Sequence, residues 1–164
     1  MTDYEIRPPR SDEFAAVGEV TVEAYRLGGL LVADVGYEDE LRDVSRRAAH
    51  TELLAAVAVS GQVLGSVAVV HPGTKYAEVS RPGELEFRML AVASTARGRG
   101  IGEALTRAVL ERARELGAGR VVLCSLESMR TAHRLYERIG FRRLPERDWE
   151  PFPGTALIAY GYDL

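Results

Sequence analysis

The chain has little of the material from which disulfides, metal sites and membrane spans are made. Cys124 is the single cysteine among 164 residues, and together with three scattered histidines it gives no metal-ligand spacing. The longest apolar stretches, such as Leu53–Val59 and Val67–Val70, fall far short of the roughly 20 residues that cross a bilayer. We therefore expect no internal disulfide, no metal and no membrane partner.

A surplus of positive charge is missing as well. The formal net charge is −3, whereas binding to nucleic-acid phosphates needs a clustered basic surplus. The first residues, which include Asp3 and Glu5, lack the basic start and apolar core of a secretory signal. We expect no nucleic-acid partner, a mature protein that begins where the sequence does, and a cytoplasmic location.

What is present is the composition of an ordinary globular domain, with 46% hydrophobic and 27% charged residues. A chain of 164 residues has the usual length of one domain and can bury a core. It contains no internal repeat, low-complexity segment or linker. We expect residues 1–164 to form a single domain.

Hydrophobic periodicity predicts the order of strands and helices. In the first half we expect a strand at Tyr4–Arg7 and then a helix that is capped by Ser11, stopped by Gly28 and Gly29, and has Phe14, Val17, Val20 and Ala24 on one face. A second helix follows, with Tyr37, Leu41, Val44 and Ala48 on one face. After it we expect a hairpin of two strands within Leu53–Val70, which turns at Ser60, Gly61 and Gln62. In the second half they are a loop at His71–Gly83, a strand at Glu84–Val92, a helix from Ile101 to Leu116, a short strand at Val121–Cys124, a helix over Ala132–Ile139 closed by Gly140, a strand from Phe141, a Pro-rich turn around Trp149–Gly154 and a last strand at Thr155–Tyr162.

The most informative segment joins the strand at Glu84–Val92 to the helix that follows it. It reads Arg97-Gly98-Arg99-Gly100-Ile101-Gly102. Glycines at a strand-to-helix turn let the main chain approach a ligand closely, and the N–H groups of the first helical turn point at that ligand with the positive end of the helix dipole. The turn therefore predicts a pyrophosphate site.

Two common classes of pyrophosphate site fit the spacing poorly. A P-loop ends in Gly-Lys-Ser or Gly-Lys-Thr, and no lysine stands in this turn. A dinucleotide-binding fold needs G-x-G-x-x-G in its first βαβ unit, whereas Gly98, Gly100 and Gly102 are spaced G-x-G-x-G and follow an antiparallel hairpin. Nucleoside triphosphate hydrolysis and NAD binding are both disfavoured.

The turn resembles the signature of the GNAT superfamily of N-acetyltransferases, which is Arg or Gln, two residues, Gly, any residue, then Gly or Ala. The order of the elements and the Leu135–Phe141 segment resemble that family too, so the resemblance covers nearly the whole chain. It implies an α/β fold with a central mixed, mostly antiparallel sheet flanked by helices. In such a fold the strands at Glu84–Val92 and Val121–Cys124 splay apart.

The resemblance implies acetyl-CoA as the cosubstrate. Its pantetheine arm would pair with main-chain groups of Leu90, Ala91 and Val92 like an added strand. Its pyrophosphate would lie on the N–H groups of Arg97, Gly98, Arg99, Gly100, Ile101 and Gly102. Because the backbone does most of this binding, side chains there can vary except at the glycines, where a Cβ would collide with phosphate oxygens.

The implied reaction is direct transfer of an acetyl group to a primary amine in a ternary complex. A base has to remove a proton from the amine, and an acid can assist the departing thiolate. Glu86 lies where the family often places the base, with a pKa raised by partial burial, and Glu84 competes for this role. Tyr136 matches the family's general acid, although a tyrosine on the apolar face of a short helix also fits a core position.

The sequence departs from the family pattern at one position. The family often has an asparagine seven residues before its tyrosine, and Met129 stands there in this chain. Ser128 is the candidate that would replace its contact with the coenzyme. Elsewhere we expect Cys124 to be a small buried hydrophobe and not an acyl-carrying nucleophile, and His133 to lie on the surface.

The acceptor is the least defined part of the prediction. Its pocket is expected among the first two helices, the His71–Gly83 loop and the turn near Trp149. The aromatic residues that could line it, or simply pack, are Tyr25, Tyr37, Tyr76 and Trp149. A small-molecule or peptide amine is the expected partner, and the family makes a homodimer plausible. The alternative, which the missing asparagine favours, is a non-catalytic module that binds or senses acyl-CoA.

Overall fold

The computed structural model describes residues 3–28 and 36–164. Contacts divide the chain into two units, one formed by Met1–Val69 with Met89–Ala108 and the other by Val70–Arg88 with Val109–Leu164. Each unit therefore combines segments that are distant in the sequence.

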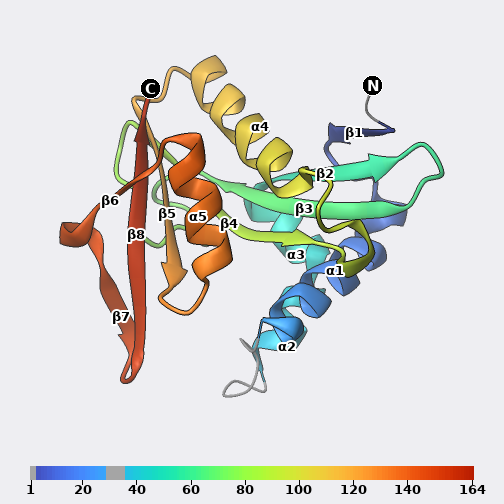
Figure 1. Cartoon of the computed structure of the whole chain (residues 1–164), viewed down its shortest axis with the longest axis horizontal. Coiled ribbons are helices and arrows are strands. Elements are labelled where there is room, and N and C mark those ends of the chain that lie inside the picture. Colours follow the sequence, from blue (N-terminus) through green and yellow to red (C-terminus); the bar gives the residue numbers. More distant parts are fainter. Residues whose placement is uncertain (1–2, 29–35) are drawn as a thin grey trace. The chain divides into compact units, whose positions relative to one another are not determined.

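Three strands of the first unit pair in the order in which they occur along the chain. β1 (Tyr4–Arg7) pairs antiparallel with β2 (Glu52–Ala58), and β2 pairs antiparallel with β3 (Val63–Val70), as Figure 1 shows. Every residue of β3 is buried, because its β-branched and small apolar side chains suit a strand that is covered on both faces. The predicted hairpin is confirmed.

The first helix, α1 (Phe14–Leu27), ends as predicted, with Gly28 as its C-cap, while Gly29 lies outside the described residues. Its start differs from the prediction, because Ser11 does not cap it. Ser11 instead begins a 3-10 turn at Ser11–Glu13, in which the Glu13 carboxylate accepts the backbone N–H of Arg10 (2.8 Å). The Glu13 side chain, which is longer than that of Ser11, therefore accepts the free backbone N–H before the helix.

The second predicted helix is in fact two helices, α2 (Tyr37–Arg42) and α3 (Val44–His50). The chain breaks at Asp43, which has a ψ of 70°, and the Asp43 carboxylate accepts the backbone N–H of Arg46 (3.2 Å). Aspartate competes with the helix by bonding to nearby backbone groups, and it is a favoured N-cap. This local hydrogen bond overrides the continuous apolar periodicity on which the prediction rested.

The strands of the second unit gather around β8 (Thr155–Asp163). It pairs antiparallel with β5 (Arg120–Leu126), β6 (Arg142–Arg143) and β7 (Trp149–Phe152) (Figure 1). The strand predicted from Phe141 is thus only two residues long, and the segment predicted as a Pro-rich turn is largely strand β7. Proline is tolerated in an edge strand, where its missing N–H need not pair.

β4 (Glu84–Val92) has the bounds predicted from the sequence. It pairs in parallel with β5 from Glu84 opposite Arg120 to Glu86 opposite Val122, and no further. Beyond this point Met89 has a φ of 57°, which interrupts the regular pleat. The strand order is β1-β2-β3-β4-β5-β8-β6, with β7 on β8, so the mixed, mostly antiparallel sheet with splayed β4 and β5 is confirmed.

The end of β4 and the start of α4 (Ile101–Glu115) pack tightly in the first unit. Ile101 is 1% exposed and Leu105 is fully buried. A Cβ added to Gly65 in β3 would lie 2.7 Å from the Ala91 carbonyl oxygen and 3.1 Å from the Ile101 side chain. A side chain at position 65 would therefore displace the main chain of β4. The helix α5 (Arg130–Ile139) belongs to the second unit and ends at Gly140, as predicted.

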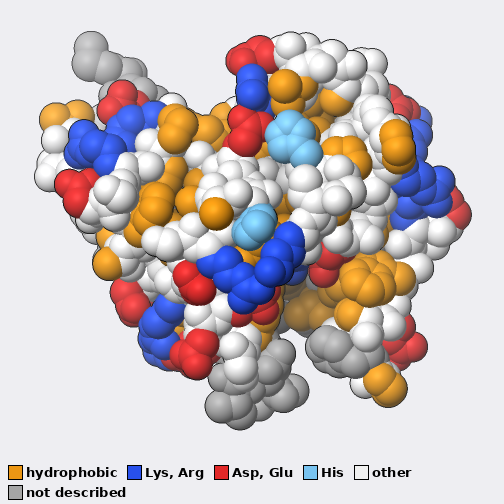
Figure 2. All heavy atoms as spheres, turned by 180° about the vertical axis from the view of Figure 1, so that it is seen from behind, with side chains coloured by type: hydrophobic (Ala, Val, Ile, Leu, Met, Phe, Trp, Pro, Cys, Tyr) orange, Lys and Arg blue, Asp and Glu red, His pale blue; other side chains and the backbone are white. Residues whose placement is uncertain are grey.

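Basic and acidic side chains lie next to each other over the face seen in Figure 2 and do not form one extended patch of either sign. Many arginines are paired with carboxylates, as Arg42 is with Glu19 and Glu38. No helix in the described part of the chain is long and apolar enough to cross a membrane. Exposed ion pairs of this kind contribute little to stability, so the fold depends mainly on its apolar core.

Candidate functional site

The glycine turn between β4 and α4 adopts a conformation that only glycine takes easily. Gly98 has a φ of 79° and Gly100 a φ of 76°, in the left-handed region that a Cβ disfavours. A Cβ at either position would meet no protein atom within 4 Å. Backbone conformation, and not crowding by the protein, is thus what requires glycine here, while the side of the turn where a Cβ would stand is open to a ligand.

The main chain of the turn is oriented as an anion site requires. The N–H of Ala104 bonds to the Gly100 carbonyl (3.0 Å), so α4 begins there and the N–H groups of its first residues have no partner within the helix. The side chain of Ile101 is buried in the core, and that of Arg99 forms an exposed ion pair with Asp3. The turn therefore offers a ligand its backbone, and pyrophosphate fits such a group of donors.

A residue of α1 that the sequence analysis missed holds this turn. The Glu23 carboxylate accepts the backbone N–H of Ser94 (3.0 Å), at the start of the 3-10 turn Ser94–Ala96 that precedes the glycines. This hydrogen bond lowers the pKa of Glu23. The two residues are 71 positions apart, and no local pattern marks an exposed helical glutamate as an anchor.

The predicted pantetheine segment lies at the end of β4. Pairing between β4 and β5 ends at Glu86, so Leu90, Ala91 and Val92 take no part in that ladder. The Ala91 side chain is 2% exposed, and those of Leu90 and Val92 are half-buried. The main-chain groups of this segment are therefore not used in pairing with β5.

The ring of Tyr136 packs in the core, which is one of the two roles weighed for it. Its side chain is 5% exposed, and its ring contacts Phe87 and Phe141, with centroids 5.8 Å away in each case, and Tyr160 at 6.0 Å. Its hydroxyl makes no hydrogen bond within the described part of the chain. Burial, with a smaller effect of Tyr160, raises the pKa of Tyr136, so the phenol keeps its proton at neutral pH and has no internal acceptor for it.

The structure separates the two candidate base residues on β4. Glu86 is fully buried, and burial raises its pKa against the effect of the hydrogen bonds that it accepts. Burial alone would also raise the pKa of Glu84, but the Arg147 guanidinium binds both of its oxygens (2.7 and 2.6 Å) and the net effect lowers that pKa. Glu84 is thus held as an ion-paired carboxylate, and Glu86 is the better candidate for proton transfer.

A third carboxylate, which the sequence analysis did not consider, lies beside Glu86. One carboxylate oxygen of Glu78, one of Glu86 and the sulfur of Cys124 all lie within 4.8 Å of one another. The Cys124 thiol donates to Glu78 Oε1 (3.2 Å). Burial first, and the charge of Glu78 second, raise the pKa of this thiol, so it stays protonated, and a protonated thiol is a poor nucleophile.

His133 is buried, and its predicted surface position is wrong. It is 8% exposed, its Nε2 lies 3.1 Å from the Ser125 hydroxyl, and its ring centroid lies 5.4 Å from that of Tyr160. Burial lowers the pKa of His133 and favours the neutral ring. Spacing could have revealed this, because His133, Tyr136 and Ile139 follow one another at steps of three and form the buried stripe of α5.

The segment expected to touch the coenzyme through Ser128 precedes α5. Ser128 is exposed, and its carbonyl accepts the N–H of Arg130 (2.9 Å). Met129, which stands in place of the family's asparagine, has its sulfur 3.5 Å from the Ser125 hydroxyl. The Ser128 side chain is thus accessible to a ligand, whereas Met129 is partly occupied by the protein.

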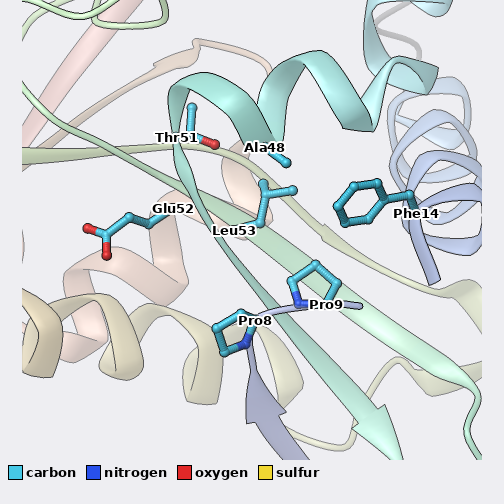
Figure 3. A pocket seen from close by; sticks show the side chains of 7 residues that line it. All are labelled: Pro8, Pro9, Phe14, Ala48, Thr51, Glu52 and Leu53. Carbon is cyan, nitrogen blue, oxygen red and sulfur yellow. The ribbon is translucent and has the colours of Figure 1, made fainter. Parts of the chain in front are cut away.

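A pocket of about 230 Å³ lies in the first unit, and none of the predicted site residues lines it. Its lining comes from Pro8, Pro9, Phe14, Ala48, Thr51, Glu52 and Leu53. Figure 3 shows Phe14, Leu53 and Pro9 directed toward one another, while the Glu52 carboxylate points away from them. The pocket is open and largely apolar and brings together no acid, base or nucleophile.

Comparisons with known proteins agree on one family. The model of the acetyltransferase (GNAT) family matches residues 20–141. An uncharacterized N-acetyltransferase of Schizosaccharomyces pombe is 31% identical over 123 residues, which are 74% of this chain and 71% of that protein. N-acetylaspartate synthetase of Danio rerio is 38% identical over 98 residues, which are 58% of this chain but only 32% of that protein. The chain thus matches about a third of the length of the latter relative.

A solved structure shares the fold over the whole chain. The PaiA N-acetyltransferase from Thermoplasma acidophilum, in complex with coenzyme A, superimposes with a TM-score of 0.73 and covers 99% of this chain and 100% of its own. Sequence identity between the two is 14%, so this likeness concerns the fold alone.

Proposed function

The chain belongs to the GNAT acetyltransferase family, and on that premise we propose that it moves the acetyl group of acetyl-CoA directly to a primary amine in a ternary complex. The acceptor is a small-molecule or peptide amine. The family supplies the class of reaction, while the roles of individual residues in this chain rest on their positions and chemistry.

The observation that carries the proposal is the glycine turn. Gly98 and Gly100 have positive φ angles and open space where a Cβ would stand, directly before the N-terminus of a helix. Backbone N–H groups in this arrangement bind pyrophosphate oxygens. Arg97, Gly98, Arg99, Gly100, Ile101 and Gly102 therefore hold the pyrophosphate of acetyl-CoA, and Leu90, Ala91 and Val92 hold its pantetheine arm, with Ser128 as a further contact.

Tyr136 acts as the general acid. Acetyl-CoA supplies an activated thioester, and its sulfur must take up a proton when the C–S bond breaks. The raised pKa of Tyr136 keeps this side chain protonated at neutral pH, and its hydroxyl has no competing acceptor in the described part of the chain. Tyr136 donates this proton to the departing sulfur and regains one from the amide nitrogen by way of solvent.

Glu86 acts in removing the proton from the amine by way of water or a neighbouring group, because its own side chain is fully buried. A primary ammonium has no lone pair for attack, so it must lose one proton before the C–N bond can form. The raised pKa of Glu86 brings this carboxylate closer to neutral pH, where a base works best. Because catalysis needs the deprotonated form, activity is lost as the pH falls through the raised pKa of Glu86.

Calorimetric titration with acetyl-CoA, CoA and NADH in parallel tests the proposal first. We expect acetyl-CoA and CoA to bind and NADH not to bind. A panel of primary amines is then assayed by release of the free thiol, and at least one amine should accelerate this release. Absence of acetyl-CoA binding would remove the basis of the proposal, because the glycine turn would then be only structural.

The same experiment separates an enzyme from a module that merely senses acyl-CoA, the role that Met129 in place of asparagine favours. Such a module binds acetyl-CoA but releases no thiol with any amine or peptide. In such a module, Glu86→Gln and Tyr136→Phe would leave the affinity for acetyl-CoA unchanged. Neither variant would change a rate, because the module has no turnover. Thiol release that depends on an amine excludes this role.

A further inference from the structure

The predicted base, Glu86, has a more accessible carboxylate beside it. The side chain of Glu86 has none of its surface exposed, so no amine can touch it directly. The side chain of Glu78, in the loop before β4, is 21% exposed. One oxygen of Glu78 lies within 4.8 Å of one oxygen of Glu86, so the accessible carboxylate is next to the buried one.

The loop that carries Glu78 is fastened by Glu86. Both oxygens of Glu86 accept the backbone N–H of Glu78 (3.1 and 3.2 Å), and its Oε1 also accepts those of Val79 (3.2 Å) and Ser80 (3.0 Å). Arg147 donates to the Val79 carbonyl (3.0 Å) and fixes the same turn. The position of the Glu78 main chain is therefore set by buried partners and not by solvent.

The carboxylate of Glu78 is held by two donors on one oxygen. Its Oε1 receives the Arg88 guanidinium (2.9 Å) and the Cys124 thiol (3.2 Å). Arg88 is in turn fixed by the Tyr76 carbonyl (3.1 Å). The second oxygen, Oε2, accepts no hydrogen bond from the described residues. A rigid carboxylate with one free oxygen and partial exposure is suited to receive a donor from a ligand.

The surroundings favour a cation at that oxygen. Among the described residues, the two carboxylates of the cluster form one ion pair, with the guanidinium of Arg88, while the partly buried thiol of Cys124 stays neutral. The neighbouring Arg147 and Glu84 neutralise each other. The indole of Trp149 lies close enough to Cys124 to influence the pKa of its thiol. Trp149 is 37% exposed, and aromatic ring faces attract ammonium groups.

On the basis of the proposed function, we propose that Glu78 is the residue that contacts the acceptor, binding its primary ammonium through Oε2 and taking the first proton from it. The transfer converts the ammonium and the Glu78 carboxylate into a neutral amine and a carboxylic acid. The proton then leaves to solvent from Glu78. Glu86 acts through Glu78 and positions it.

Steady-state kinetics of Glu78→Gln, with acetyl-CoA and an amine found in the panel, tests this assignment. The loss of a charged hydrogen bond predicts an increase in the KM for the amine of about tenfold or more. The KM for acetyl-CoA and the calorimetric affinity for acetyl-CoA should stay unchanged. Glu111→Gln, which removes an exposed carboxylate from α4 in the same unit, is the matched control and should alter neither KM.

Two further measurements distinguish contact from structural support. In the wild-type protein, an alcohol of the same length as the amine should compete with it only weakly. Its inhibition constant should be at least tenfold higher than the KM for the amine. Glu78→Asp keeps the charge but shortens its reach, and it should recover part of the affinity that Glu78→Gln loses. This comparison of ligands in the wild-type protein still gives a result if the glutamine variant does not fold.

The possible failures are distinguishable. If the wild-type protein acetylates an amine and Glu78→Gln keeps the KM for that amine within twofold, the assignment of Glu78 is wrong and the proposed function stands. An inhibition constant of the alcohol that equals the KM for the amine also overturns the assignment. If the wild-type protein does not bind acetyl-CoA, the proposed function itself fails.

Discussion

The two candidate regions differ in what they present to a ligand. The glycine turn in the first unit presents its backbone, whereas the cluster of Glu78, Glu86 and Cys124 in the second unit presents a side chain. In the turn two side chains are already engaged, since Ile101 is buried in the core and Arg99 is paired with Asp3. The backbone N–H groups at the start of α4 have no partner within the helix and can bind an anion. In the cluster the backbone N–H groups of residues 78–80 are bonded to Glu86, and a side-chain oxygen remains free for a cation.

This difference determines how each region responds to substitution. A site made of backbone depends on local conformation, so it tolerates changes of side chain unless they alter φ and ψ. A site made of side chains depends on every partner that fixes the reactive group. Substitutions in the second unit should therefore alter catalysis most, and those in the turn should act only where a glycine is lost.

The largest effect is expected for Tyr136→Phe in the second unit. Removing a general acid lowers kcat by about 10² or more, while the KM for acetyl-CoA should barely change because the ring packing remains. Thiol-release kinetics measure both values. Tyr160→Phe alters the neighbouring ring, 6.0 Å away, and should leave kcat within about threefold. Equal kcat for wild type and Tyr136→Phe would show that this side chain only packs.

A smaller effect, confined to binding, is expected in the turn. Gly100→Ala places a Cβ on a residue with a φ of 76°, which costs about 1–2 kcal/mol. The free turn relaxes to another conformation, so we expect about tenfold weaker binding of acetyl-CoA by calorimetry. Gly61→Ala, with a φ of 93° in the hairpin between β2 and β3, should lower stability similarly without weakening binding. If Gly100→Ala and Gly61→Ala bind acetyl-CoA with the same affinity, the conformation of the turn is not what determines binding.

The two carboxylates of β4 should affect stability with opposite dependence on pH. Glu84 has a lowered pKa in the folded state, so its stabilising effect is present above its unfolded pKa and is lost as the pH falls through the folded value. Glu86 has a raised pKa, so its effect is present below its unfolded pKa and is lost as the pH rises through the folded value.

Urea unfolding between pH 3 and pH 7 can measure this contrast. Glu84→Gln should lower stability at pH 7 more than at pH 3, and Glu86→Gln should lower it more at pH 3 than at pH 7. Parallel pH profiles for both variants would contradict the assigned pKa directions.

The smallest effect is expected for a change of side chain in the turn itself. Arg99→Ala removes an exposed ion pair with Asp3, of a kind that contributes about 0–1 kcal/mol to stability, and leaves the backbone donors in place. We expect the affinity for acetyl-CoA to stay within about threefold of wild type. A loss of more than tenfold would mean that the guanidinium, and not the backbone, holds the pyrophosphate.

Much of the fold could be predicted because it follows from local pattern. The bounds of β1 and β4 were predicted correctly, as were the ends of α1 at Gly28 and of α5 at Gly140. Periodicity failed where a single side chain bonded to the backbone, as Asp43 does between α2 and α3. It failed again at β7, because pairing with β8 made a strand of a segment that is locally typical of a turn.

The sequence alone determined the glycine turn, since a backbone site is specified by consecutive residues and by the strand and helix on either side of them. Tertiary structure alone decided which carboxylate is accessible. Glu84, Glu86 and Glu78 look alike along the chain, and only folding ties the first to Arg147, buries the second and leaves an oxygen of the third free. The physical reason is that burial, charge partners and hydrogen bonds come from segments up to 63 positions away, and these determine what a carboxylate can do.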